Sequence, residues 1–154
     1  MKEPRHGHSA CAVGEKYLAV TAGRIGSGNS CEMYDVTLNK WTDLPKLTTK
    51  RHYHSSCVFE NSSLFVFCGI NNENRSYVNT IERLDISMFQ QNVVTHWEIF
   101  SFSNTGTEFT ARQGLGSCQI DSEGILIVGG YTGEHTKESF YLNVGQKTLT
   151  KTIN

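Results

Sequence analysis

Short apolar runs, separated by Gly, Asn, Ser and Asp, follow one another along the whole chain. No segment keeps apolar residues at the 3.6-residue spacing of an amphipathic helix over a sufficient length. In the first part of the chain this pattern predicts strands at His8–Val13, Lys16–Ala22, Ser30–Val36 and Lys40–Leu44. The second of these is apolar throughout, which is typical of an inner strand covered on both faces. The pattern therefore predicts an all-β fold.

A repeat underlies these runs. Each of three arginines is followed six residues later by Cys and eighteen residues later by a Gly that ends an apolar run; these arginines are Arg5, Arg51 and Arg112. Two residue types that keep register three times indicate a triplicated unit. We expect one domain over residues 1–154, with repeat units at about 5–50, 51–111 and 112–154.

Each unit continues with a second shared pattern. Tyr34-Asp35 precede Trp41 in the first unit, and Leu84-Asp85 precede Trp97 in the second. The third unit has Leu142-Asn143 and Leu149 at these places. The extra residues of the second unit fall between strands, where insertions are tolerated. Each unit is expected to form four short antiparallel strands, and such a unit repeated about every 50 residues is typical of a β-propeller.

This pattern of Arg, His or small residues, a Gly pair, Tyr-Asp and Trp resembles the kelch repeat. The resemblance implies a partial kelch-type β-propeller with about three four-stranded antiparallel blades. Because a propeller closes with about 4–8 blades, we expect the chain to be a fragment of a larger propeller. A half-ring that dimerises is the less favoured alternative. Open blade edges would also favour self-association.

The composition and the lengths of the apolar runs argue against two classes of function, nucleic-acid binding and membrane insertion. The formal net charge is −1, and a nucleic-acid binder would need a basic footprint. No apolar run reaches the roughly 18 residues of a membrane helix, and the N-terminus has no secretory signal pattern. Five cysteines in a chain of 154 residues indicate reduced thiols. We therefore expect a cytoplasmic protein that binds neither nucleic acid nor membranes.

The stretches "RHGHSAC" and "RHYHSSC" raise the question of a metal site, because His-x-His on a strand places both rings on one face. The third unit reads "RQGLGSC" and lacks both His residues. The histidines are therefore interpreted as strand-start residues, and no metal or cofactor is expected. Cys11, Cys57 and Cys118 recur at one repeat position, where a small residue filling the core is the favoured interpretation.

The resemblance implies a protein–protein interaction module, such as a scaffold, an adaptor or a substrate receptor of a ubiquitin ligase. The alternative is an enzyme on a similar propeller, of the metal-dependent oxidase or sugar epimerase type. No catalytic motif is present, so no enzyme is expected. The loops between the second and third strands are predicted to bind a protein partner through Arg24, Asn29, Asn71, Asn74, Arg75, Tyr131 and His135. Arg5, Arg51 and Arg112 are further candidates, with a blade-to-blade ion pair as their alternative role.

Overall fold

Three β-sheets, antiparallel except for one parallel strand pair, make up most of the computed structural model, which describes residues 1–24, 26, 28–91, 93, 96–106 and 108–152. The first sheet contains β1 (Ser9–Val13), β2 (Tyr17–Thr21), β3 (Cys31–Asp35) and β4 (Lys40–Leu44). The second contains β6 (Ser55–Phe59), β7 (Ser63–Phe67), β9 (Ile81–Asp85) and β10 (Glu98–Ile99). The third contains β12 (Gly116–Gln119), β13 (Gly124–Val128), β14 (Ser139–Asn143), β15 (Thr148–Lys151) and β11 (Ser103–Thr105). None of the three closes on itself over the described residues.

Four strands of each sheet pair in the order in which they follow one another along the chain, so each repeat unit forms one meander, and only β11 joins its sheet out of this order. The predicted all-β class and the four predicted strands of the first unit are confirmed, within two residues at each end. The first hairpin turns at Gly14–Lys16, where Val13 pairs with Tyr17. The equivalent hairpins pair Phe59 with Ser63 and Gln119 with Ile125. The repeat inferred from the arginines is thus a repeat of structure.

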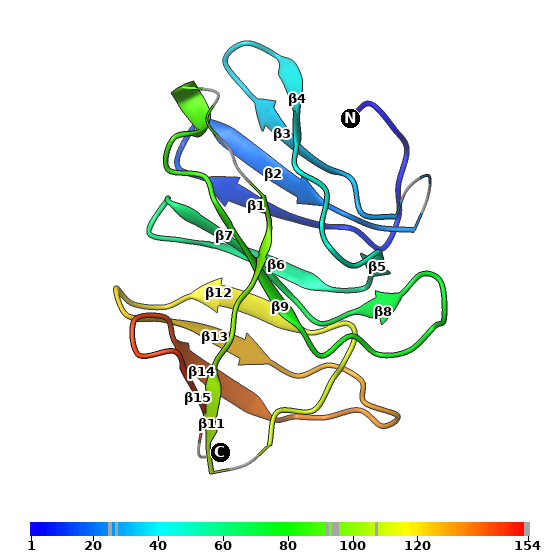
Figure 1. The fold of residues 1–154 in the computed structure, drawn as a ribbon, viewed down its shortest axis with the longest axis vertical. Coiled ribbons are helices and arrows are strands. Elements are labelled where there is room, and N and C mark those ends of the chain that lie inside the picture. The colour runs from blue at the N-terminus through cyan, green and yellow to red at the C-terminus, as the bar shows by residue number, and fades with distance from the viewer. Residues whose placement is uncertain (25, 27, 92, 94–95, 107, 153–154) are drawn as a thin grey trace.

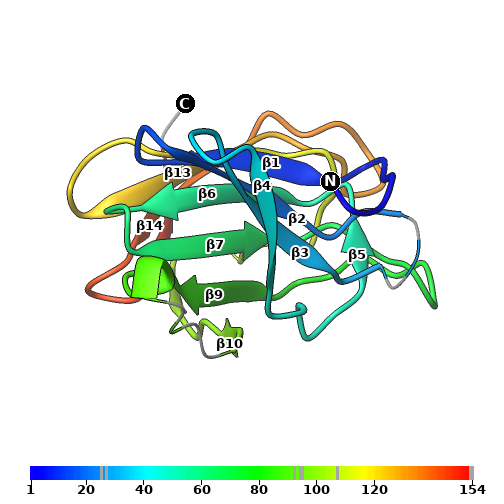
Figure 2. The same ribbon diagram turned by 90° about the horizontal axis from the view of Figure 1, so that it is seen from above.

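The first strands of the three sheets lie side by side. β1 lies beside β6, and β6 lies beside β12, without hydrogen-bonded pairing between these strands. The sheets succeed one another along the long axis in Figure 1, and Figure 2 shows β1 and β6 running next to each other. Loops of one kind from different sheets are therefore brought to the same end of the molecule.

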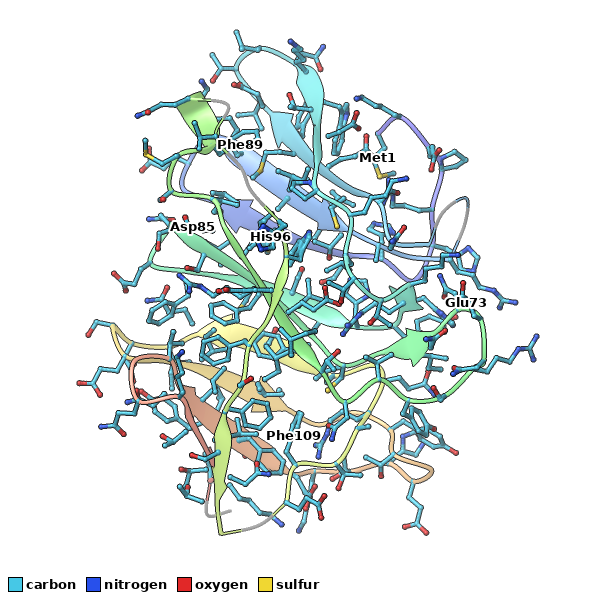
Figure 3. The ribbon with its side chains drawn as sticks, viewed as in Figure 1. Met1, Glu73, Asp85, Phe89, His96 and Phe109 are labelled. Atoms are coloured by element: carbon cyan, nitrogen blue, oxygen red, sulfur yellow. The ribbon has the colours of Figure 1, made fainter. Side chains whose placement is uncertain are left out.

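Two apolar cores hold the sheets together. One lies between the first and second sheets and includes Met33, Leu64 and Trp97. The other lies between the second and third sheets and includes Phe65 and Phe140. Side chains fill the spaces between the ribbons in Figure 3. Successive strand residues point to opposite faces, so β7, which is buried throughout, contributes to both cores.

The Gly at the end of each second strand meets a close backbone approach. Gly23, Gly69 and Gly130 have φ angles of +112°, +100° and +110°. A Cβ atom at Gly69 would lie 2.7 Å from the carbonyl oxygen of His52 and 2.9 Å from Cβ of His54. Only glycine accommodates both the backbone conformation and the approach, which explains why this residue marks the repeat.

The third sheet departs from the four-strand prediction, because it has a fifth strand. Strand β11 precedes β12 in sequence and pairs in parallel with β15, placing Asn104 opposite Leu149. Other parts of the second unit's extra length form short elements instead of plain loops. These are β8 (Ile70–Asn71), which pairs with β5 (Arg51–His52), and the 3₁₀ turn η1 (Phe89–Gln91). Phe89 packs edge-on against Tyr17 with ring centroids 5.5 Å apart.

The cysteines only partly follow the core prediction. Cys31, Cys57 and Cys68 are buried, and Cys11 is half-buried. Cys118 is exposed, so the core prediction is wrong at this position. The reason is its place on the third sheet, since it lies on the face turned away from the second sheet, where no further sheet packs in the described chain. No described helix is long and apolar enough to cross a membrane.

Candidate functional site

The loops that follow the second strand of each sheet meet the segments that precede the first strand of the next. The Asn72 side chain donates through Nδ2 to the carbonyl oxygen of Gly23 at 3.1 Å and contacts Nδ1 of His52 through Oδ1. Lys50 and Glu73 form an ion pair of 2.7 Å at the same end. These contacts fix the loops of the first and second sheets relative to each other.

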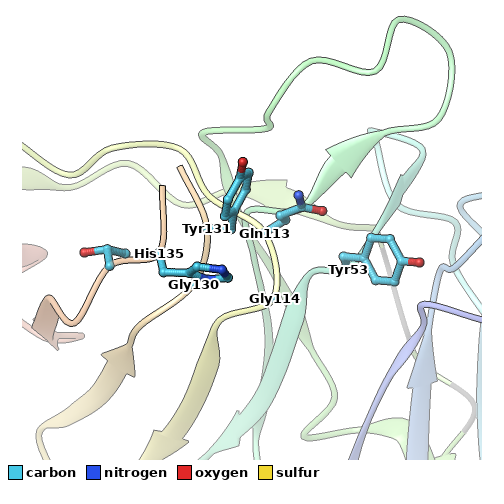
Figure 4. Close-up of a pocket in the computed structure, with 7 residues that line it drawn as sticks. Tyr53, Gln113, Gly114, Gly130, Tyr131 and His135 are labelled. Atoms are coloured by element: carbon cyan, nitrogen blue, oxygen red, sulfur yellow. The ribbon is translucent and has the colours of Figure 1, made fainter. Parts of the chain in front are cut away.

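The larger pocket at this end encloses about 620 Å³. Tyr131 and His135 come from the loop after β13, and their rings pack edge-on with centroids 5.3 Å apart. Tyr53 and Gln113 come from the segments that lead into β6 and β12. Figure 4 shows Gln113 between Tyr131 and Tyr53. The backbones of Gly114 and Gly130 and Thr136 complete the lining.

A smaller pocket of about 280 Å³ lies next to the larger one and is cationic. Arg24 and Arg75 line it together with His52, Ile70 and Asn72. His52 and the neighbouring Tyr53 of the larger pocket have ring centroids 4.8 Å apart, so the two pockets are adjacent. Arg24 and Arg75 are exposed. The structure thus brings together four predicted residues, two arginines in one pocket and Tyr131 with His135 in the other.

The three predicted asparagines have contacts within the chain. Asn29 donates through Nδ2 to the carbonyl oxygen of Leu47 at 2.9 Å, which ties its loop to the segment after β4. Oδ1 of Asn71 accepts from the backbone N–H of Glu73 at 2.7 Å, and Oδ1 of Asn74 accepts from that of Ser76 at 3.0 Å. Asparagine commonly orders turns in this way. These residues shape the loops that carry Arg24 and Arg75.

The repeated arginines lie inside the sheets. Each donates through Nη1 to the carbonyl oxygen seventeen residues later, at 2.9 Å for Arg5 and Arg51 and 3.3 Å for Arg112. Each also forms an ion pair through Nη2 with a glutamate of its own repeat unit, namely Glu32, Glu82 and Glu138 respectively. The expected ion pair therefore lies within a unit and not between units. Their role in partner binding stays a prediction, while the contacts seen hold the second and third strands together.

Four of the five cysteines are buried or half-buried, which disfavours the thiolate form of these four side chains. Burial raises the pKa of Cys57 and Cys31 to about 12, and that of Cys11 and Cys68 to about 11. Such thiols stay protonated at neutral pH and are weak nucleophiles. Among the residues that the structure describes, no three side chains of His, Cys, Asp or Glu lie close enough together to hold a metal ion.

His54 shows how a strand-start histidine is held. Its Nε2 shares a hydrogen bond of 2.8 Å with Oγ1 of Thr21 in the first sheet, and its Nδ1 is buried without a partner. Burial lowers the pKa of His54 to about 3, and the nearby charge of Arg51 adds to this effect. The ring is therefore neutral in the folded protein at neutral pH, whereas in the unfolded chain it takes up a proton near pH 6.5.

The buried His54 predicts that the folded protein loses stability in acid. Since the unfolded state binds the extra proton, folding stability is lost as pH falls below 6.5, by roughly 1.4 kcal/mol per pH unit. Urea unfolding at pH 7 and pH 5 should differ by about 2 kcal/mol from this group alone. The variant His54→Leu should lose this part of the pH dependence, and His135→Leu, which changes an exposed ring, should retain it. Equal pH dependence in both variants would contradict the assignment.

Tyr53, Gln113 and Gly114 were not predicted as site residues. They occupy the two positions after the repeated Arg, which read His-Gly, His-Tyr and Gln-Gly in the three units. The residue types at these two positions vary beside an invariant Arg. This variation could have identified them as surface positions, because an interior position would keep its residue type. Comparison with models of known protein families found no match, and no curated protein matches the chain.

Proposed function

We propose that the chain is a protein-interaction module of the kelch-type propeller class, which binds a partner protein at the end where the two pockets lie. Its architecture supports this class, because three meandering sheets place their first strands side by side. The observation that carries the binding proposal is the larger pocket, where Tyr53, Tyr131 and His135 converge from different segments. Tyrosine and arginine are enriched among the residues that dominate protein–protein binding energies.

The charge of the site specifies the partner further. Arg24 and Arg75 line the smaller pocket, and the described residues that line the two pockets include no carboxylate. A guanidinium pairs well with carboxylates through two parallel hydrogen bonds. The partner we propose is therefore a protein segment that places an apolar or aromatic side chain in the larger pocket and acidic side chains against Arg24 and Arg75.

Affinity capture from cell extract with the purified chain tests this proposal. A partner that binds here should be lost with Tyr131→Ala/His135→Ala and with Arg24→Ala/Arg75→Ala, each weakening its affinity roughly 30-fold. The control variants Lys46→Ala and Leu38→Ala change exposed residues away from both pockets, and should capture it normally. A set of captured proteins that is the same for all four variants would contradict the proposed site.

A further inference from the structure

The first sheet has an outward face built from residues that are core residues in the other sheets. Thirteen and fifteen residues after the repeated Arg, the second sheet has Leu64 and Val66 and the third has Ile125 and Ile127, all fully buried against the preceding sheet. In the first sheet these positions are Leu18, which is half-buried, and Val20, which is 2% exposed although it belongs to neither of the two cores. We call the surface formed by Leu18, Tyr34 and Trp41 the N-terminal face.

The third sheet has the complementary outward face. Fourteen and sixteen residues after the Arg, the side chains point toward the following sheet, and Phe65 and Phe67 are fully buried there. In the third sheet these positions are Leu126 and Val128, and Val128 is 41% exposed. Cys118 lies opposite Leu126 and shares its face. We call the surface formed by Cys118, Leu126, Val128 and Tyr141 the C-terminal face.

The two tryptophans also differ in whether a neighbouring sheet covers them. Trp97 is 3% exposed, packs against the first sheet and donates through Nε1 to the carbonyl oxygen of Pro45 at 2.8 Å. Trp41 occupies the equivalent place on the N-terminal face, where it packs on Tyr34 with ring centroids 4.8 Å apart. It is half-buried, and its Nε1 has no acceptor among the described residues. A sheet packed on this face would supply one.

Backbone hydrogen bonds between sheets follow a repeat of their own. Two residues after each Arg, Tyr53 N–H donates to the carbonyl of Gly7 at 2.7 Å, and Gly114 N–H donates to that of Tyr53 at 2.8 Å. At the ends of this series, within the described residues, Gly7 N–H has no acceptor and the carbonyl of Gly114 has no donor. The open donor belongs to the first unit and the open acceptor to the third.

A second series of backbone hydrogen bonds between sheets also stays open at both ends. Gly23 N–H donates to the carbonyl of Arg51 at 3.0 Å, and Gly69 N–H donates to that of Arg112 at 2.9 Å. By this rule Gly130 N–H should donate to the Arg carbonyl of a following unit, and the carbonyl of Arg5 should accept from a preceding one. Neither group has a backbone partner in the part of the chain that the structure describes. In both series, the open N–H at one end of the chain therefore matches an open carbonyl at the other end.

We propose that a second copy of this chain docks head to tail, with its N-terminal face on the C-terminal face of the first. The contact repeats the one between adjacent sheets, so Gly7 N–H of one copy donates to Gly114 of the other, and Gly130 N–H donates to the Arg5 carbonyl. Two such contacts close a ring of six sheets, within the range of about 4–8 for propellers. Closure by rotation yields a discrete dimer, as for cyclic oligomers in general.

Closure of the ring would add residues of the second copy to the larger pocket. Gly114 and Gly130, whose open backbone groups the second copy engages, both line that pocket. The docked copy brings its own Arg5–Gly7 segment next to them and makes the pocket a shared site between two chains. The docking itself does not depend on partner binding, because it uses the sheet faces and these backbone groups.

The mass of the chain in solution tests the proposal. Sedimentation equilibrium should give twice the 17.2 kDa of one chain. Val128→Lys, on the C-terminal face, should halve this mass, as should Cys118→Arg on the same face. Ile99→Lys is the matched control, because Ile99 is 49% exposed in a strand of the middle sheet, and it should leave the dimer intact. Circular dichroism confirms that each variant is folded.

A mixing experiment isolates the head-to-tail geometry. Leu18→Lys blocks only the N-terminal face and should be monomeric alone, as should Val128→Lys. Each variant keeps the face that the other has lost, so an equimolar mixture should form a dimer through one contact. A wild-type monomer, an open-ended polymer, an effect of Ile99→Lys equal to that of Val128→Lys, or a mixture that stays monomeric would each overturn the two-chain ring. Loss of partner capture without a change in mass would concern only the binding proposal.

Discussion

Arg51→Met is expected to lower the free energy of unfolding by about 3–5 kcal/mol. Both side chains of the Arg51–Glu82 pair are fully buried. Arg51 also donates to the carbonyl oxygens of Cys68 at 2.9 Å and Thr80 at 3.1 Å. Methionine fills a similar volume but leaves a buried carboxylate without its counter-charge and the carbonyl of Cys68 without its donor, while the carbonyl of Thr80 keeps only the N–H of Cys68. This is the costly case for a buried pair.

Urea unfolding followed by circular dichroism measures this loss. Arg83→Met is the matched control, because Arg83 forms a 3.2 Å ion pair with Glu98 from side chains 33% and 56% exposed. Removing such a pair should change stability by no more than about 1 kcal/mol. The double variant Arg51→Met/Glu82→Gln should recover part of the loss, since it removes the stranded charge. Equal effects of Arg51→Met and Arg83→Met would show that the buried arginine does not hold the sheet together.

Gly69→Ala is expected to destabilise the protein by about 3 kcal/mol or more. The φ angle of +100° is unfavourable for alanine, and the new Cβ would lie 2.7 Å from the carbonyl oxygen of His52. That carbonyl belongs to backbone already fixed by strand pairing between His52 and Ile70. The clash can therefore be relieved only by moving the two segments apart.

Gly14→Ala separates backbone strain from the clash. Gly14 has a φ of +57°, and a Cβ atom there would meet nothing within 4 Å. Only the cost of the left-handed conformation remains, about 1 kcal/mol. Thermal unfolding of both variants should give a clearly larger drop in Tm for Gly69→Ala. Similar drops would mean that the close approach at Gly69 relaxes without cost.

The repeat made much of the fold predictable. Arg, Cys and Gly kept register in three units, and apolar runs with turn residues between them located the strands of the first unit within two residues. Local signals of this kind work because each sheet is a meander of consecutive strands. Strand β11 carried no such signal, since Ser103–Thr105 is a polar exposed segment. Its pairing depends on β15, far along the chain.

The candidate site was predictable only in part. Loop position and polar composition identified Arg24, Arg75, Tyr131 and His135, and these do line pockets. The same reasoning could not show that the guanidinium of Arg51 turns inward, because burial depends on a glutamate thirty-one residues later. Nor could it show that Cys118 is exposed, because this depends on which sheet packs on its face.

The placement of β11 has a consequence for synthesis on the ribosome. The strands of the first and second sheets are contiguous in sequence, so each sheet can form soon after its last strand emerges. Strand β11 must instead wait for β15, whose Thr150 lies 45 residues after Thr105. At about 5–20 residues per second, this segment stays unpaired for roughly 2–9 seconds. Because Ser103–Thr105 is polar, we expect this segment to leave unpaired backbone groups, and not apolar side chains, open on the nascent chain during that time.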